Sequence, residues 1–355
     1  RLGLDTCLQP AIDVAERGFA IGRHTARYWS EAQARAPVAG ELRTDPDQAT
    51  TLRAIAQSGP TAIYEGPIAA KIAGASWLSE SDLAAYAPAW VQPMHKSYGS
   101  LDVHELPPPS QGVAALEALA ILEQLGVDTL PDQVQAVSLA LEDAYAEVRD
   151  GRDVAHLLEP EYVRARAAAT AAPAGELGGG TVYLCAVDEE RMAVSFIQSL
   201  YQSFGSGVLV PGTGIYLNNR AACFAVHGRV EPGRRPFHTL MPGLLTDPDG
   251  SLIGPFGVMG GFIQAQAHAQ FVIAAQRADL DPQAALDHPR FRVDGRAVQL
   301  EPPLWDEAQK LEGRGFKAIR SRDVSLFGGG QAVFVRGGAL LGGSDARKDG
   351  CAAGI

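Results

Sequence analysis

The stretch Gly178-Gly-Gly-Thr-Val-Tyr-Leu-Cys-Ala-Val-Asp188 marks a change in this chain, from a glycine run to an alternating strand that begins at Thr181. Glycine permits strained backbone conformations, so the run suits a peptide bond that is cut. A hydroxyl attacks amides poorly unless a base lies beside it. If the chain is cut after Gly180, the freed α-amine of Thr181, with a pKa of about 8, becomes that base. The alternative is a plain loop followed by an ordinary β-branched strand residue.

Seven motifs along the chain resemble, in the same order, those of the gamma-glutamyltransferase family. They are Leu106-Pro-Pro-Pro-Ser-Gln-Gly112, Thr181-Val-Tyr-Leu-Cys-Ala-Val-Asp188, Ser199-Leu-Tyr-Gln-Ser-Phe-Gly-Ser-Gly207, Gly214-Ile-Tyr-Leu-Asn-Asn219, Arg235-Pro-Phe-His-Thr-Leu-Met-Pro242, Met259-Gly-Gly261 and Gly343-Ser-Asp-Ala-Arg-Lys-Asp-Gly350. Each is weak alone, and their shared order makes the resemblance specific. It implies an α/β fold, the four-layer αββα sandwich of N-terminal nucleophile hydrolases, with two subunits cut from one precursor.

The cut divides the chain into two predicted parts that together form one composite domain. Residues 1–180 are the large-subunit portion, mostly helical, and end in an Ala/Gly-rich processing segment from Glu161 to Gly180. Residues 181–355 are the catalytic small subunit. The family's large subunit normally begins upstream of Pro10 and supplies an arginine that grips the substrate carboxylate. Part of the pocket is therefore expected to come from outside this sequence.

Hydrophobic periodicity predicts the main elements. Helices are expected in Pro10 to Tyr28, Gln48 to Ala56, Gly66 to Ala73, Gln111 to Leu125, Asp132 to Val148 and Gln264 to Ala278, with a helix start at Ser79 to Asp82 and a strand in His95 to Leu106. Hairpins are expected from Val182 to Gln198, around Asp247 to Gly250 and around Gly337-Gly338.

Ser199, Gly260 and Gly261 complete the predicted catalytic group. Ser199 lies on the strand that returns beside Thr181, where the family has a threonine, and its hydroxyl is expected to orient the nucleophile. Gly260 and Gly261 precede a predicted helix, and paired glycines let two backbone N–H groups point at one spot, as an oxyanion hole requires. The resemblance implies that role. An ordinary strand serine and a glycine turn are the alternatives.

The chain departs from the family at the substrate-binding positions. Gamma-glutamyl enzymes use an acid after their Asn-Asn pair to hold the substrate's α-ammonium, but here Arg220 follows the pair and Cys223 stands at the acid's place. His238-Thr239 replaces the serine pair that binds the glutamyl carboxylate. Tyr201 replaces an asparagine near the nucleophile. These changes resemble the acylase and amidohydrolase branch of the family.

Three of these residues indicate what the pocket would accept. If Arg220 or His238 faces inward, an anionic substrate end is its natural partner. If Tyr201 narrows the acceptor side, water is favoured over a bulky amine, and hydrolysis over transfer. The alternatives are a surface charge, a satisfied hydrogen-bonding histidine and a half-buried aromatic ring.

The composition limits the kinds of partner and cofactor that we expect for this chain. Acidic residues outnumber basic ones, 41 to 30, and the net charge of -11 argues against nucleic acid or an anionic membrane. The eight histidines form no close ligand pair and the four cysteines are scattered, so we expect no metal, no organic cofactor and no disulfide framework. The cysteines favour a reducing compartment, hence the cytoplasm over the periplasm. The first residue is Arg1, which leaves an upstream signal peptide open.

The sequence therefore predicts a self-processing amidohydrolase in which Thr181 forms an acyl-enzyme with a small carboxylate-bearing amide, oxamate-like or of the glutaryl/cephalosporin-acylase kind. The two cleaved subunits are expected to stay associated, with a dimer of such pairs as one arrangement. One rival is a gamma-glutamyl transferase or glutathione hydrolase, which the missing acid at Cys223 disfavours. The other is a binding or scaffold protein that is never cut.

Overall fold

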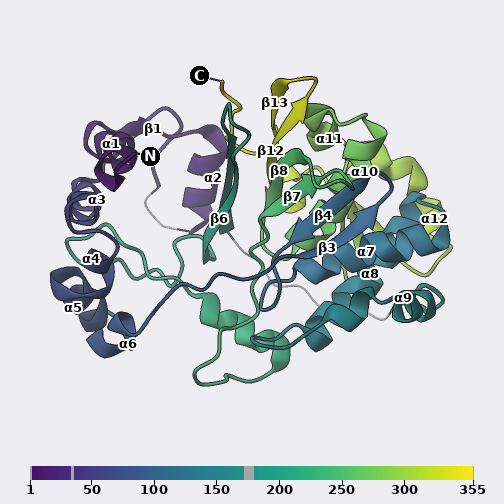
Figure 1. Cartoon of the computed structure of the whole chain (residues 1–355), viewed down its shortest axis with the longest axis horizontal. Helices are drawn as coiled ribbons and strands as arrows, with labels where there is room; N and C mark the ends of the chain where they lie inside the picture. Colours follow the sequence, from purple (N-terminus) through teal and green to yellow (C-terminus); the bar gives the residue numbers. More distant parts are fainter. Residues whose placement is uncertain (1, 33–35, 172–179, 355) are drawn as a thin grey trace. The chain divides into compact units, whose positions relative to one another are not determined.

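Figure 1 shows the computed structural model of the chain, which describes residues 2–32, 36–171 and 180–354. It contains two compact units, Arg1–Trp90 with Leu200–Asn219, and Val91–Ser199 with Arg220–Ile355. This division follows compactness and does not test the predicted cut after residue 180. Residues 172–179 of the predicted processing segment lie outside the described residues.

The first unit is mainly helical. It contains α1 (Leu4–Arg17), β1 (Phe19–Ala20), α2 (Arg23–Ala32), β2 (Leu42–Arg43), α3 (Pro46–Ser58), α4 (Thr61–Tyr64), α5 (Gly66–Gly74) and α6 (Glu80–Ala84). Ile12 and Ala15 of α1 pack on Ala49 of α3. The helices predicted near Gln48 to Ala56 and Gly66 to Ala73 are confirmed, as is the helix start at Ser79, which forms a capping box with Asp82.

One helix prediction in this unit is wrong. The span from Pro10 to Tyr28 is not a single helix, because α1 ends at Arg17 and α2 starts at Arg23. Gly18 breaks it with φ of 89°, and a Cβ there would lie 2.9 Å from the Arg43 carbonyl oxygen. The chain at this point is therefore fitted to the short β1–β2 pair and cannot continue as a helix.

The later segment 200–219 joins this unit through buried and aromatic contacts. Thr51 Oγ1 donates to the Thr213 carbonyl at 2.7 Å. Phe204 lies with its ring centroid 5.0 Å from Trp29 and 5.2 Å from Tyr216. The segment that follows β6 is thus part of the first unit's own packing.

The second unit is built on a six-stranded antiparallel sheet. Its order is β13 (Ala339–Ser344), β12 (Gly329–Arg336), β8 (Leu252–Met259), β7 (Gly243–Thr246), β4 (Leu101–Glu105) and β3 (Met94–Tyr98). The single strand predicted from His95 to Leu106 is wrong, since β3 and β4 form a hairpin that turns at Gly99 with φ of 58°. Apolar and polar residues alternate in the same way along one long strand and along two short paired strands, so the pattern alone could not separate the two.

Helices cover one face of this sheet (Figure 1). They are α7 (Gly112–Leu125) and α10 (Ile263–Arg277), with α8 (Leu130–Glu147) against α7. Phe256 of β8 stacks 5.0 Å from Phe271 of α10, ring to ring. The three predicted helices here are confirmed. The remaining elements are η1 (Ala155–Leu158), α9 (Pro160–Ala167), η2 (Arg220–His227), α11 (Pro282–Asp287), η3 (Pro302–Glu307), α12 (Ala308–Glu312), η4 (Val324–Phe327) and a small sheet of β9 (Phe291–Asp294), β10 (Ala297–Leu300) and β11 (Lys317–Arg320).

A second sheet, the pair β5 (Gly180–Val187) and β6 (Ala193–Tyr201), packs on the other face. Tyr183 faces inward, and a Cβ on Gly257 of β8 would lie 2.4 Å from its ring, so only glycine fits there. All three predicted hairpins are confirmed. The outer face exposes Val182, Leu184, Val194 and Phe196. The unit thus has helix, sheet and sheet layers, and the fourth layer of the αββα sandwich stays a prediction.

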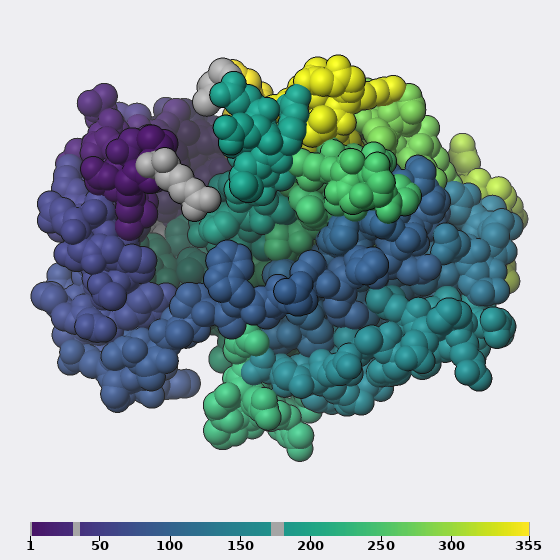
Figure 2. All heavy atoms as spheres, viewed as in Figure 1, coloured from purple at the N-terminus to yellow at the C-terminus, as the bar shows by residue number. Residues whose placement is uncertain are grey.

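Figure 2 shows the turn of the β5–β6 hairpin, in teal, beside the yellow residues near the end of the chain. A groove here is lined by β5, β12, β13 and residues 350–354, with Cys185 and Cys351 among them. Within the part of the chain that the structure describes, its lining contains no predicted site residue. Among the described helices, none combines the length and apolar character needed to cross a membrane.

Candidate active site

Thr181 lies at the start of β5 with its side chain toward the six-stranded sheet, and 6 % of the residue is exposed. Its Oγ1 donates a hydrogen bond to Ser199 Oγ of β6 at 3.3 Å. On the same face, Tyr183, two residues further along β5, and Ser195, four residues before Ser199 on β6, pair their hydroxyls at 2.8 Å. The alternation of the hairpin therefore brings the predicted nucleophile and its predicted orienting serine together.

The predicted glycine pair occupies the junction between β8 and α10. Gly260 has φ of 136° and Gly261 has φ of 73°, conformations that side chains resist. A Cβ on Gly260 would lie 2.7 Å from Ile263 Cγ2. Both glycines are therefore required by the turn from strand to helix, and the first N–H groups of the helix that follows point back toward this turn.

Gln264 is a site residue that the sequence reasoning missed. It lies in the first turn of α10 and is fully buried. Its Nε2 donates a long hydrogen bond of 3.5 Å to Thr181 Oγ1, and its backbone N–H donates to the Gly261 carbonyl at 3.1 Å. Gln264 thus links the nucleophile to the glycine pair. The available signal was a glutamine three positions after the pair, at the start of an Ala-rich helix.

Gln111 was quoted in a motif but not assigned to the site. It is buried at the start of α7, and its Nε2 donates to the Gly261 carbonyl at 3.3 Å and to the Thr239 carbonyl at 3.4 Å. The loop before it pairs with the 238–240 segment, since Gln111 N donates to His238 O at 2.9 Å and His238 N to Pro109 O at 2.8 Å. The proline-rich loop therefore holds the glycine pair and the predicted substrate segment in one framework.

Three of the predicted substrate-binding residues, Arg220, Cys223 and Thr239, form one group of contacts. Arg220, at the start of η2, is only 7 % exposed, so it is not a surface charge. Its Nη1 donates to Thr239 Oγ1 at 2.9 Å and to Cys223 Sγ at 3.8 Å. Thr239 and Cys223 are fully buried. A guanidinium matches a carboxylate through paired, charge-assisted hydrogen bonds, so Arg220 brings a buried positive charge to this group.

His238 and Tyr201 stand differently from this group. Burial lowers the pKa of His238, helped by the positive charges of Arg220 and Arg235, although the Pro236 carbonyl that its Nδ1 meets at 2.6 Å opposes the shift. A neutral His238 leaves Arg220 as the cation of the pair. Tyr201 ends β6 with φ of 76° and belongs to the first compact unit, so the structure does not assign it to the group around Thr181.

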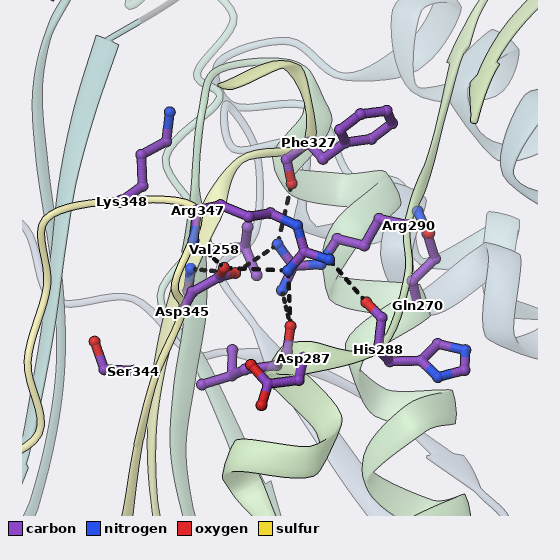
Figure 3. Close-up of polar contacts among 12 residues, drawn as sticks. Val258, Gln270, Asp287, His288, Arg290, Phe327, Ser344, Asp345, Arg347 and Lys348 are labelled. Atoms are coloured by element: carbon purple, nitrogen blue, oxygen red, sulfur yellow. Dashed lines mark hydrogen bonds and ion pairs between the residues drawn. The ribbon is translucent and has the colours of Figure 1, made fainter. Parts of the chain in front are cut away.

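A buried ion-pair network joins the segment between α11 and β9 to the segment that follows β13 (Figure 3). Arg290 and Arg347 converge on Asp345, with Nη1 to Oδ2 at 2.8 Å and Nη1 to Oδ1 at 3.1 Å. Arg347 Nη2 also donates to Glu301 Oε2 at 2.6 Å. Two cations and two anions neutralise one another away from water, which such a network requires.

The network reaches the glycine pair through one backbone segment. Arg290 Nη1 donates to the Phe327 carbonyl at 3.0 Å, as Figure 3 shows. The next residue, Gly328, packs so closely that a Cβ on it would lie 2.6 Å from the Met259 carbonyl oxygen, and a Cβ on Gly260 would lie 3.2 Å from Gly328 Cα. The C-terminal motif therefore supports the backbone that presents Gly260.

A second buried pair fixes β8 from the helical side. His268 of α10 accepts the Val258 N–H at its Nε2, at 3.0 Å, so its Nδ1 carries the proton that bonds Glu105 Oε1 at 2.6 Å. Burial raises the pKa of Glu105, an effect that His268 opposes. Among the described residues, no three His, Cys, Asp or Glu side chains gather as metal ligands.

Comparisons with known proteins place this geometry in a family. The family described as gamma-glutamyltranspeptidase matches residues 1–355, which confirms the resemblance seen in the motifs. The "Glutathione hydrolase-like YwrD proenzyme" of Bacillus subtilis is 31% identical over 407 residues, covering 100% of this chain and 77% of that protein. The "Oxamate amidohydrolase proenzyme" of Klebsiella pneumoniae is 33% identical over 358 residues, covering 90% of this chain and 67% of that protein. The crystal structure of a cephalosporin acylase from Bacillus halodurans superposes with a TM-score of 0.91 at 38% identity, covering 99% of this chain and 74% of that one.

Proposed function

This chain belongs to the gamma-glutamyltranspeptidase family, and on that premise we propose that it is a self-processing amidohydrolase with Thr181 as its nucleophile. The observation that carries the proposal is the placement of the Thr181 hydroxyl. It is buried at the start of β5, donates to Ser199 Oγ at 3.3 Å and meets the Gln264 carboxamide, whose helix begins at the glycine pair. The relatives from Bacillus subtilis and Klebsiella pneumoniae are both named as proenzymes, which supports cleavage before the threonine.

The chemistry has two stages. In the first, Thr181 Oγ attacks the Gly180 carbonyl, the Gly180–Thr181 amide becomes an ester, and water hydrolyses the ester to leave a free α-amine on Thr181. In the second, that amine takes the hydroxyl proton while Oγ attacks the substrate's amide carbonyl. The Gly260 and Gly261 N–H groups stabilise the tetrahedral oxyanion. The leaving amine takes the proton, and water releases the acid from the acyl-enzyme.

The buried cation supports a substrate with an anionic end. Arg220 lies beside Thr239, which Gln111 ties to the glycine pair, so a carboxylate bound at Arg220 would sit in the same framework as the oxyanion donors. A small carboxylate-bearing amide satisfies this arrangement through charge-assisted hydrogen bonds. The name of the Klebsiella pneumoniae relative, an oxamate amidohydrolase, agrees with this class, and the acylase from Bacillus halodurans supports an acyl-enzyme route.

Gamma-glutamyl hydrolysis or transfer is the second candidate, favoured by the name of the Bacillus subtilis relative. It requires a counter-charge for the substrate's α-ammonium. The position expected to carry it holds the buried Cys223 in place of an acid, and Arg220 lies in contact with that cysteine. A cation placed there would meet repulsion instead of attraction. Glutathione consumed faster than acidic amides would favour this candidate over ours.

The fold proposal follows from the same family. We infer the complete αββα sandwich, because the outward face of β5–β6 carries the exposed apolar residues Val182, Leu184, Val194 and Phe196. A sheet that packs on another sheet with one face and is apolar on its other face is typical of an inner layer.

A denaturing gel and a substrate panel test the function. Wild-type protein is expected to give two fragments in place of one band near 37.5 kDa, and sequencing of the smaller fragment should begin at Thr181. Thr181→Ala should stay intact. Ser195→Ala is the matched control, since it removes a hydroxyl from the same hairpin that bonds Tyr183 and not Thr181, and it should still be cut. In the panel, Arg220→Gln should abolish a preference for oxamate or glutaryl amides over neutral amides. Active protein that remains one chain would contradict the proposal.

A further inference from the structure

Gln264 differs from the other buried glutamines of its helix. Gln266 bonds the Val293 backbone with both ends of its carboxamide, at 3.0 and 2.7 Å. Gln270 does the same with Phe291, at 3.0 Å for each end. These two side chains join α10 to β9. They show that structural glutamines in this helix satisfy both their donor and their acceptor.

Gln264 satisfies only its donor end. Its Nε2 reaches Thr181 Oγ1, while its Oε1 is buried with no hydrogen-bond partner among the described residues. A buried acceptor without a donor is costly, and native proteins keep few of them. The carboxamide is also directed at Thr181, the residue that gains a free amine on cleavage. Its unused acceptor therefore lies where a new donor is expected to arise.

We propose that Gln264 Oε1 accepts a hydrogen bond from the α-amino group freed at Thr181, so that one carboxamide holds both the base and the hydroxyl of the nucleophile. The inference rests on the proposed function, because the amine exists only after the cut. In threonine the α-nitrogen and Oγ are attached to adjacent carbons, so a group that contacts one is within reach of the other. Gln264 becomes a catalytic residue, since it touches the reacting atoms.

The neutrality of the side chain matters to this role. The amine must lose its proton to act as the base, and a nearby carboxylate would hold it as ammonium. A carboxamide accepts a hydrogen bond from the amine without adding charge. It can also fix the amine so that its lone pair faces Oγ. Glutamine at position 264 therefore combines orientation with an amine that stays readily deprotonated.

The test compares Gln264→Glu and Gln264→Met with a charge control. Gln309→Glu adds the same charge to the exposed side of α12, where solvent screens it. The titration of the Thr181 amine is followed by the rate at which an added amine-acylating reagent modifies it at each pH. The modification is read by mass spectrometry of the small fragment. This measurement needs no substrate. The acid limb of kcat against pH is recorded in parallel.

Gln264→Glu is expected to raise the titration midpoint of the amine, and the acid limb, by about one to two pH units, while Gln309→Glu leaves both unchanged. Gln264→Met should lower the midpoint and reduce kcat about tenfold with little change in KM, the effect of one lost hydrogen bond. If Gln264→Glu does not fold, Gln264→Met alone tests the proposed hydrogen bond to the amine. Cleaved protein whose amine titrates identically in wild type and variants would overturn this inference and leave the proposed function standing. Protein that is never cut at Thr181 would overturn both.

Discussion

Asp345 offers the sharpest test of how the site is supported, through the substitution Asp345→Asn. The carboxylate is buried and accepts four hydrogen bonds. Oδ2 receives Arg290 Nη1 at 2.8 Å and Gly330 N at 3.1 Å, and Oδ1 receives Arg347 N at 2.9 Å and Arg347 Nη1 at 3.1 Å. Whichever oxygen becomes the amide nitrogen, it then faces two donors and loses both bonds.

The expected loss of stability follows from the burial of Asp345. Removing one charge from a buried ion pair costs about 3–5 kcal/mol, because the remaining charge is left uncompensated. Here Glu301 balances only one of the two arginines that remain. For a cooperative unit of more than 200 residues, one kcal/mol corresponds to roughly 2 °C in melting temperature, so we expect a fall of roughly 6–10 °C. The activity of the folded variant should also fall, since Arg290 holds the segment that supports Gly260.

The assay is thermal unfolding followed by circular dichroism, with kcat measured well below the transition. Asp279→Asn is the matched control. Asp279 pairs with Arg336 at the surface, where its side chain is 87% exposed, and exposed pairs contribute little. The control should melt within about 1 °C of wild type. If Asp345→Asn melted no lower than Asp279→Asn, the network would not stabilise the fold as reasoned here.

Two further outcomes are expected. Gly261→Ala keeps the backbone N–H but strains the φ of 73°, so it should displace this proposed oxyanion donor and lower kcat about 10²–10³-fold. Gly250→Ala, also at positive φ but with open space around its Cβ, should leave kcat unchanged. Equal losses in the two variants would contradict the assignment. Burial lowers the pKa of His238, so the unfolded chain binds that proton more readily and stability should fall as pH drops below about 6.5. His238→Gln should flatten the melting temperature between about pH 5 and 7, and an unchanged slope would show that other groups dominate.

The sequence predicted the hairpin that carries the nucleophile well, because residues close together in the sequence determine it. Alternation from Thr181 to Val187 and a short polar turn are enough to place Thr181 and Ser199 on facing strands, and the side chains then meet at 3.3 Å. The same holds for α10, which begins within one residue of the predicted start at Gln264. Where neighbouring residues decide the outcome, pattern reasoning is sufficient.

The wrong or missed predictions lie where contacts between segments distant in the sequence determine the structure. Gly18 ends α1 because Arg43 packs against it, and the β3–β4 hairpin turns at Gly99, which a strand period alone does not mark. Gln111 and Gln264 were missed for the same reason. A buried glutamine differs from an exposed one only through its contacts, and those contacts join residues 128 to 150 positions apart for Gln111.

Helix α10 explains how two sheets can hold one reaction centre in register. Its first turn reaches Thr181 of the β5–β6 sheet through Gln264, and its next turn reaches the Val258 N–H of the six-stranded sheet through His268. Apolar packing alone would tolerate small sliding of one sheet over the other, whereas hydrogen bonds weaken steeply with distance and angle. Glu105 fixes the tautomer of His268 that can accept the Val258 N–H. The polar residues buried in this otherwise Ala-rich helix therefore set the separation between the nucleophile and the glycine pair that follows β8.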